Sequence, residues 1–260
     1  MKDLKDIRLF CLDMDGTIYL EQTLLPLVKE TLAHLKKRAK ILFLTNNSSK
    51  SVQAYVEKLN RLGIAVTEQD IYTSGQATCE YLNQHFLNQS VYLVGTPALT
   101  EEFKAHHIPL NDKNPDLVVL GYDTTLTYQK LVQCTTFLNQ GKPYIATHPD
   151  INCPATPYYV PDIGSFMALI EKSTNRKPDL ICGKPYTIMG STIMEKFHLQ
   201  PHQIAMVGDR LSTDIAFAKN NGFVSILVLS GETTLKQYKN QSIQADFVFP
   251  SIAELLKELP

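Results

Sequence analysis

The sequence lacks tryptophan, long apolar runs and an excess of either charge, and these absences narrow the classes of protein it can encode. Its 25 Lys and Arg residues nearly balance 26 Asp and Glu residues, which gives a formal net charge of −1. The one basic run, Lys36-Lys37-Arg38, follows a helix-like segment, where cations suit the helix dipole. Nucleic-acid binding is therefore not expected. No apolar stretch reaches the roughly 18 residues of a membrane span, so no membrane association is expected.

Cysteine is also scarce, because the chain has only five, an odd number, and no pair has CxxC spacing. Cys11 and Cys182 lie inside apolar runs and are expected to be small core residues. The first residues, Met1-Lys2-Asp3, do not resemble the apolar core of a signal peptide. A reducing cytoplasm therefore fits the sequence better than secretion.

What the chain does contain is an alternation of short apolar runs and amphipathic segments. Helical spacing of apolar residues is clear after Val28, after Val52 and after Leu131. Strand–helix–strand alternation predicts parallel sheets with right-handed crossovers, which is an α/β fold. The predicted strands are Ile7–Leu12, Ile41–Leu44, Val91–Val94, Leu117–Leu120, Tyr144–Ala146, Ile204–Val207, Val224–Leu229 and Phe247–Phe249.

Two carboxylates, Asp13 and Asp15, follow the first apolar run directly, and Gly16 comes next. Open α/β sheets bind ligands at the carboxyl ends of their strands. Two acids placed there need a metal or another cation to balance their charge. An EF-hand calcium loop does not fit, because its glycine occupies the sixth position and Gly16 would be the fourth. A plain Asp-Gly turn is the alternative, but it rarely follows a core strand in this way.

Three further strand ends carry polar groups. Thr45-Asn46-Asn47-Ser48-Ser49 follows Ile41–Leu44 and offers a hydroxyl and backbone N–H groups, although such a stretch can also be an ordinary helix cap. Gly183-Lys184-Pro185 supplies the cation that would balance clustered carboxylates. Gly208 and Asp209 follow the apolar run Ile204–Val207, and Asp214 comes five residues later, near the start of a predicted helix.

These four strand ends, in this order, resemble the haloacid dehalogenase-like (HAD) superfamily of phosphatases. All four of its motifs are matched, as Asp13-x-Asp15-Gly16-Thr17, Thr45, Lys184 and Gly208-Asp209-x₄-Asp214. The long insert resembles the NagD-type, or p-nitrophenyl-phosphatase-like, branch. The resemblance implies a Rossmann-like parallel-sheet HAD core of residues 1–75 and 180–260, with an inserted α/β C2-type cap of residues 76–179. Thr45-Asn46-Asn47-Ser48, Ala146-Thr147-His148-Pro149-Asp150 and Gly183-Lys184-Pro185 carry the closer resemblance.

The resemblance also implies the chemistry, which is Mg²⁺-dependent hydrolysis of phosphomonoesters of small metabolites, of the sugar phosphate or nucleotide type. Asp13 would be the nucleophile that forms an aspartyl-phosphate, and Asp15 the general acid and base. The side chains of Asp13 and Asp209 and the backbone carbonyl of Asp15 would bind the metal. Asp214 would orient metal-bound waters from outside that first set of ligands.

The phosphoryl group would be held by Thr45, by the backbone N–H of Asn46 and by Lys184. Substrate choice is expected to depend on the cap, where the candidates are His148, Asp150, Tyr158, Tyr159 and Asp162. This branch often has asparagine in place of His148 and glycine in place of Asp162. The physiological substrate and a homodimer through the cap are left open by the sequence.

Several rival functions share parts of this pattern. A receiver domain also uses a phosphorylated aspartate, but it is near half this length and has no inserted cap. A haloacid dehalogenase would not favour an acid at the position of Asp15. A phosphomutase or phosphotransferase of the same superfamily stays an alternative, as does a non-catalytic sugar-phosphate sensor, which the full motif set disfavours.

Overall fold

The chain forms two compact units in a computed structural model that describes residues 3–154 and 158–259. The first unit comprises Met1–Thr45, Val52–Tyr72 and Lys184–Pro260, and the second comprises Asn46–Ser51 and Thr73–Gly183. The sequence-based division into 1–75, 76–179 and 180–260 did not separate the short segment Asn46–Ser51 from the core. No described helix combines the length and the apolar character needed to cross a membrane. None of the five cysteines, all of which lie in the described part of the chain, forms a disulfide bond.

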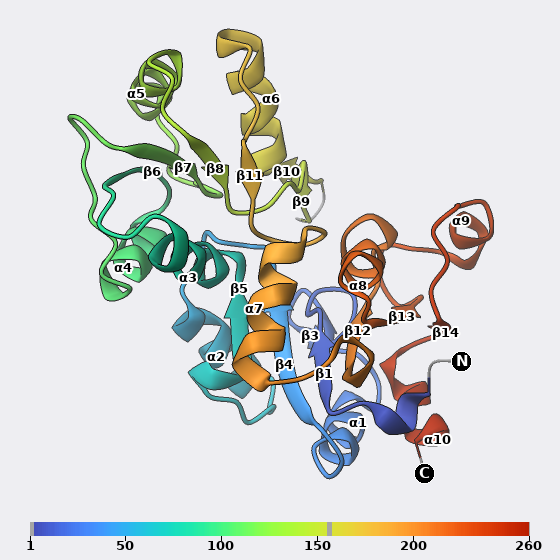
Figure 1. Ribbon diagram of the computed structural model, residues 1–260. Helices are drawn as coiled ribbons and strands as arrows, with labels where there is room; N and C mark the ends of the chain where they lie inside the picture. The colour runs from blue at the N-terminus through green and yellow to red at the C-terminus, as the bar shows by residue number, and fades with distance from the viewer. Residues whose placement is uncertain (1–2, 155–157, 260) are drawn as a thin grey trace. The chain divides into compact units, whose positions relative to one another are not determined.

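A six-stranded sheet forms the centre of the first unit, in the order β14-β13-β12-β1-β4-β5 (Figure 1). The predicted strands all form, with ends that differ by up to two residues. The three-residue strand β5 was not predicted, because Ile-Tyr-Thr is too short to show a period of its own. The strands are β1 (Leu9–Leu12), β4 (Lys40–Thr45), β5 (Ile71–Thr73), β12 (Ile204–Gly208), β13 (Val224–Val228) and β14 (Phe247–Phe249), and a small hairpin adds β2 (Tyr19–Leu20) and β3 (Thr23–Leu24).

The register of this sheet decides where the polar strand ends lie. Strand β1 is central and pairs in parallel with β12 on one side and with β4 on the other. Leu12, its last residue, lies opposite Val207 of β12 and Phe43 of β4. The residues that follow these three strands therefore emerge at one edge of the sheet, as parallel pairing requires.

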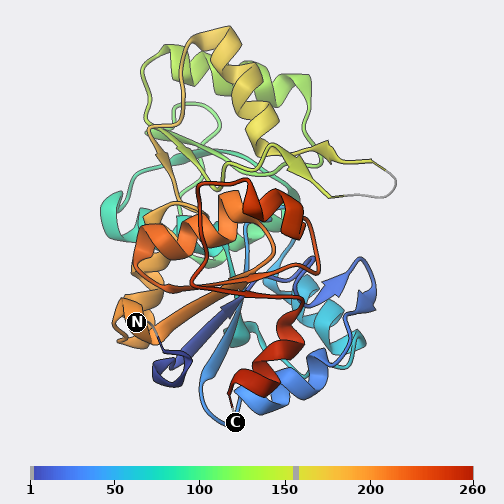
Figure 2. The same cartoon turned by 90° about the vertical axis from the view of Figure 1, so that its right-hand side faces the viewer.

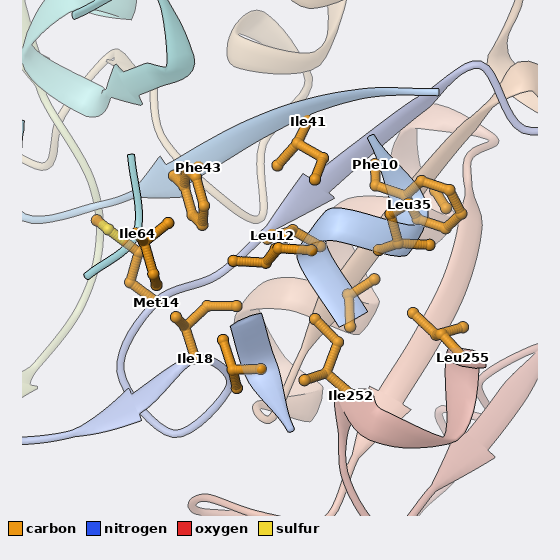
Figure 3. Packing of buried hydrophobic residues seen from close by; sticks show 14 of the residues in the cluster. Phe10, Leu12, Met14, Ile18, Leu35, Ile41, Phe43, Ile64, Ile252 and Leu255 are labelled. Atoms are coloured by element: carbon orange, nitrogen blue, oxygen red, sulfur yellow. The ribbon is translucent and has the colours of Figure 1, made fainter. Parts of the chain in front are cut away.

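One face of the sheet packs on a continuous hydrophobic core. Phe10 and Leu12, alternate residues of β1, point into it, as the period of two in a strand requires (Figure 3). Helices α1 and α10 pack side by side beneath this face (Figure 2). The helices of the unit are α1 (Val28–Leu35), α2 (Val52–Arg61), α7 (Thr187–Phe197), α8 (Ala216–Asn221), α9 (Leu235–Lys239) and α10 (Leu255–Glu258).

The second unit has its own parallel sheet, of four strands in the order β11-β8-β7-β6, and its own core. Its elements are α3 (Ser74–His85), β6 (Val91–Val94), α4 (Pro97–Ala105), β7 (Leu117–Leu120), α5 (Tyr128–Asn139), β8 (Tyr144–Ala146), α6 (Ile163–Thr174) and β11 (Leu180–Ile181). The proline-rich stretch 148–161 contains an antiparallel pair, β9 (Asn152–Cys153) with β10 (Val160–Pro161).

The core of the first unit leads to a prediction about stability. Leu35 is fully buried against the β1 face. Leu35→Ala should lower the free energy of unfolding by about 2–5 kcal/mol, because it removes buried methyl groups and leaves a cavity. Urea unfolding followed by circular dichroism measures this loss. Leu20→Ala is the matched control, since Leu20 is 46% exposed and should change stability by about 0.5 kcal/mol or less. Equal losses in both variants would contradict this account of the core.

Candidate active site

The edge of the six-stranded sheet gathers one lysine and three aspartates from separate parts of the sequence. Lys184 Nζ lies 2.7 Å from Asp13 Oδ1 and 2.7 Å from Asp214 Oδ1. The side chain of Lys184 is 3% exposed and that of Asp214 is 1% exposed. Carboxylate oxygens of Asp13, Asp209 and Asp214 all lie within 4.8 Å of one another. The predicted meeting of Asp13, Lys184, Asp209 and Asp214 is therefore present in the first unit.

Local structure holds each of these groups in place. The backbone N–H of Asp13 donates to the carbonyl of Val207 at 2.9 Å, which continues the pairing of β1 with β12 beyond the strand. Asp214 lies in a π-helical turn, Leu211–Ile215, rather than in the regular helix that the sequence suggested. Its second oxygen, Oδ2, accepts a hydrogen bond from the backbone N–H of Arg210 at 3.1 Å. Asp214 is therefore held by the ammonium group of Lys184 and by the backbone just after β12. Its orientation of metal-bound waters stays a prediction.

The buried carboxylates of Asp209 and Asp214 and the partly buried carboxylate of Asp13 lie beside one ammonium group, and the three negative charges repel one another. Burial raises the pKa of Asp13 to about 7, although Lys184 opposes this shift. Burial, with the nearby charges of Asp13 and Asp214, raises the pKa of Asp209 to about 8. For Lys184, burial alone would favour the neutral amine, but Asp13 and Asp214 outweigh it and raise its pKa above the ordinary value. Asp13 and Asp209 therefore need more positive charge than Lys184 supplies in order to stay ionised near neutral pH.

A divalent cation fits this need, and Asp209 carries the clearest sign of it. Asp209 is 3% exposed, and its Oδ2 accepts a hydrogen bond from the backbone N–H of Glu232 at 2.6 Å. Its other oxygen, Oδ1, is buried without a hydrogen-bond partner among the described residues. A buried carboxylate oxygen without a partner costs free energy, and hard oxygen ligands are those that Mg²⁺ prefers. The donor set of the site therefore fits a hard divalent ion.

Asp15 and Thr45 flank this cluster in the sequence. Asp15 is exposed and forms a backbone bridge with Tyr19, in the turn that follows β1. Thr45 is the last residue of β4 and is half-buried. Asn46, the next residue, belongs to the second unit. The roles of Asp15 in proton transfer and of Thr45 and Asn46 in phosphate binding stay predictions.

The cap candidates form a hydrogen-bonded network within the second unit. His148 Nε2 lies 3.1 Å from Asp162 Oδ1, and its Nδ1 lies 3.0 Å from the hydroxyl of Thr147. Asp162 also caps helix α6, since its Oδ1 accepts from the backbone N–H of Ile163 at 2.6 Å. Side-chain atoms of His148, Asp150 and Asp162 lie close enough to hold a metal ion. However, both ring nitrogens of His148 already have hydrogen-bond partners in the protein, which disfavours a metal ion at this position.

Asp150 connects this network to the segment after β4. Its Oδ1 accepts a hydrogen bond from Asn46 Nδ2 at 3.1 Å. Ser74 Oγ donates to the backbone carbonyl of Asn46, and Ser48 Oγ lies 3.0 Å from Thr147 Oγ1. Tyr158 and Tyr159 are exposed, and residues 155–157 beside them lie outside the described part of the chain. A direct role of these candidates in substrate choice stays a prediction.

Comparison with known proteins agrees with this geometry. Residues 10–109 match the haloacid dehalogenase-like hydrolase family, and residues 181–255 match a second HAD-hydrolase-like family. An acid sugar phosphatase of Staphylococcus aureus is 31% identical over 258 residues, which cover 98% of this chain and 99% of that protein. The chain belongs to the haloacid dehalogenase-like hydrolases.

Solved structures of this hydrolase family support the branch that the sequence predicted. A 4-nitrophenylphosphatase from Thermotoga maritima is 49% identical, with a TM-score of 0.95 and 98% of each chain covered. A glycerol phosphate phosphatase from Mycobacterium tuberculosis, solved in complex with magnesium, is 26% identical, with a TM-score of 0.90. That match covers 98% of this chain and 78% of the other. The predicted NagD-type, p-nitrophenyl-phosphatase-like branch of the hydrolase family is confirmed, as is the predicted fold class.

Sequence reasoning missed one element of this hydrolase site, the turn after β13. Residues Ser230, Gly231 and Glu232 lie against Asp209 and Gly16. The signal was present in the sequence, because Ser230 and Gly231 directly follow the predicted strand Val224–Leu229. The strand-end rule that found the other four motifs applies to this strand as well.

The raised pKa of Asp209 predicts a pH dependence for the metal-free enzyme. A carboxyl group whose pKa is raised by folding stabilises the protein below its ordinary pKa, and this stabilisation is lost as the pH rises through the folded-state value. Since the folded value is about 8 and the ordinary one is 3.8, the melting temperature should fall as the pH rises from 5 toward 8.5. Asp209→Asn should flatten this slope, because the amide does not ionise.

Differential scanning fluorimetry in EDTA, across that pH range, measures both slopes. Adding Mg²⁺ at pH 8 should restore the stability of the wild type but not of Asp209→Asn. The same pH slope in both proteins would contradict the assigned cause, because the slope would then come from other groups.

Proposed function

We propose that this hydrolase is a Mg²⁺-dependent phosphatase that cleaves phosphomonoesters of small metabolites through an aspartyl-phosphate on Asp13. The observation that carries the proposal is the placement of Lys184 between Asp13 and Asp214, close to Asp209, whose Oδ1 has no hydrogen-bond partner within residues 3–154 and 158–259. A nucleophilic carboxylate, a fixed cation and a metal-ligand oxygen at one sheet edge are the groups that phosphoryl transfer to an aspartate requires.

Asp13 is suited to attack phosphorus because it is fixed but still accessible. Its Oδ1 is held by Lys184 at 2.7 Å, and its side chain is 18% exposed, unlike that of Asp214. The attack forms an oxygen–phosphorus bond on Asp13 while the bond to the leaving alcohol breaks. A hydroxyl ion from water then attacks the phosphorus of the aspartyl-phosphate and releases inorganic phosphate, which regenerates the Asp13 carboxylate.

Asp15 is assigned the proton transfers. Its exposed position, two residues after the nucleophile, is compatible with access to both the leaving alcohol and the attacking water. In the first step it protonates the alcohol oxygen, and in the second it accepts a proton from water. The same residue therefore ends the catalytic cycle in the protonation state in which it began.

The side chains of Asp13 and Asp209, with the backbone carbonyl of Asp15, would hold the metal. When bound, a divalent ion neutralises charge on the phosphoryl oxygens and keeps the carboxylates ionised. The hydroxyl of Thr45 and the backbone N–H of Asn46 would bind further phosphoryl oxygens. Lys184 balances the charge that Asp13 and the phosphate share. Mg²⁺ is proposed as the ion because the donors are hard oxygen atoms.

The substrate class we propose is phosphorylated small metabolites of the sugar-phosphate type. Two of the three named relatives are an acid sugar phosphatase and a glycerol phosphate phosphatase, and each of these two names describes a phosphate on a polyhydroxylated carbon chain. We assign substrate selection to the second unit, through His148, Asp150 and Asp162. A cytoplasmic location, which the absence of disulfide bonds among the described residues favours, is part of the same proposal.

The proposed nucleophile can be tested directly. Asp13→Asn should abolish turnover of p-nitrophenyl phosphate, because the amide oxygen is a poor nucleophile, and the shape of the side chain is kept. Phosphate release is measured with Mg²⁺, and again after exhaustive dialysis against EDTA, which should also abolish it. Activity of Asp13→Asn within about tenfold of the wild type, which corresponds to only about 1.4 kcal/mol of barrier, would remove Asp13 from this role.

The relative importance of Lys184 and Thr45 gives a second test. An ion pair at about 4 Å is worth roughly 4 kcal/mol at an effective dielectric constant near 20, and a charge-assisted hydrogen bond about 1.5–3 kcal/mol. At about 1.4 kcal/mol per decade, Lys184→Met should lower kcat/KM by about 10²–10³ and Thr45→Val by about 10–10². Steady-state kinetics on folded variants, checked by circular dichroism, measures both. A larger loss in Thr45→Val would contradict the proposed division of roles.

A further inference from the structure

The turn after β13 encloses one oxygen of Asp209. Glu232 donates its backbone N–H to Asp209 Oδ2 at 2.6 Å, and Thr233 donates its own to the backbone carbonyl of Asp209 at 3.3 Å. Arg210, the next residue after Asp209, forms an ion pair with Glu232 at 2.9 Å. The turn and the end of β12 are therefore joined by backbone and side-chain contacts on both sides of the Asp209 carboxylate.

Two glycines make this close approach possible. A Cβ atom at Gly231 would overlap Asp209 Oδ2, would lie 2.6 Å from Asp209 Cγ and would lie 2.7 Å from the Cα of Gly16. A Cβ at Gly16, whose φ of +81° also favours glycine, would overlap the same oxygen of Asp209. The Asp209 carboxylate is thus held between two stretches of backbone, with no room for a side chain on either.

Ser230 fastens the two stretches together. Its hydroxyl donates to the backbone carbonyl of Gly16 at 2.7 Å, so the turn after β13 is tied to the loop after β1. With Oδ2 occupied and enclosed, the carboxylate of Asp209 has one oxygen left, and that oxygen, Oδ1, is buried without a partner among the described residues.

We infer that the turn Ser230–Glu232 is a positioning element for the metal, and that it fixes Oδ1 as the oxygen of Asp209 that faces the ion. Gly231 is the positioning residue, because its missing side chain lets the turn close on Oδ2. Ser230 and the backbone N–H of Glu232 act with it. This inference rests on the proposed function to the extent that Asp209 binds the metal. Partners that orient metal ligands typically account for about 10–100-fold in metal affinity.

The test compares Gly231→Ala with a matched control, Gly190→Ala, in the full chain. At both positions the new methyl group would overlap a side-chain oxygen, Oδ2 of Asp209 in one case and Oδ1 of Asn221 in the other. Both variants should therefore lower the melting temperature of the metal-free protein. Isothermal titration with MgCl₂ should show the dissociation constant raised by about 10–100-fold in Gly231→Ala and left unchanged in Gly190→Ala.

Ser230→Ala serves if Gly231→Ala does not fold, with Ser251→Ala as its control, because Ser251 caps a short helical turn outside this loop. Ser230→Ala should weaken Mg²⁺ binding and Ser251→Ala should not. An unchanged dissociation constant in a folded Gly231→Ala or in Ser230→Ala, or equal weakening in a variant and its control, would overturn the inference and leave the proposed function intact. Absence of Mg²⁺ binding by the wild type would overturn both.

Discussion

The site depends on one interaction, the contact of the buried Lys184 ammonium with the carboxylates of Asp13 and Asp214. Both distances are 2.7 Å, and the lysine side chain is 3% exposed. One positive charge cannot balance three clustered aspartates. Burial is the main cause of the raised pKa values of Asp13 and Asp209, and the charges of the neighbouring aspartates add to both shifts. With all three acids ionised, three negative charges and one positive charge leave two negative charges, which one divalent cation would neutralise. This charge imbalance is the physical basis of the affinity for a divalent ion that we propose.

Parallel strand order explains why such distant residues meet. Asp13 follows β1, and Asp209 follows β12, which pairs with β1 in register from Leu9 to Leu12. Strand pairing fixes the backbone positions of both acids without any contact between their side chains. Lys184 is the first residue of the first unit after the chain leaves the second unit. Its ion pairs with Asp13 and Asp214 fix the position of its ammonium group. The sheet thus determines the spacing of the aspartates, and the lysine balances part of their negative charge.

The sequence allowed the strands, the fold class and the central residues of the site to be predicted, because each depends on local patterns. Apolar runs mark buried strands, and a charged residue directly after such a run is conspicuous. The turn Ser230–Glu232 was missed because its contribution comes from a backbone N–H and from an absent side chain at Gly231. Neither is a residue type associated with catalysis. The pair β9–β10 was missed because two-residue strands have too few positions to show a period.

The boundary between the two units gives the last constraint. It falls within the motif Thr45-Asn46-Asn47-Ser48-Ser49, because Thr45 ends a strand of the first unit while Asn46 has its contacts in the second. Asn46 forms hydrogen bonds with Asp150 and Ser74, and Ser48 forms one with Thr147. Polar side chains of the second unit therefore orient the peptide that directly follows Thr45. In the proposed function, where the backbone N–H of Asn46 binds phosphate, a substitution at Asp150 would alter that binding through this peptide without any contact with the substrate. Loss of activity in such a variant is evidence for substrate recognition only if its effect differs between substrates, since a change in the orientation of Asn46 would affect every phosphomonoester alike.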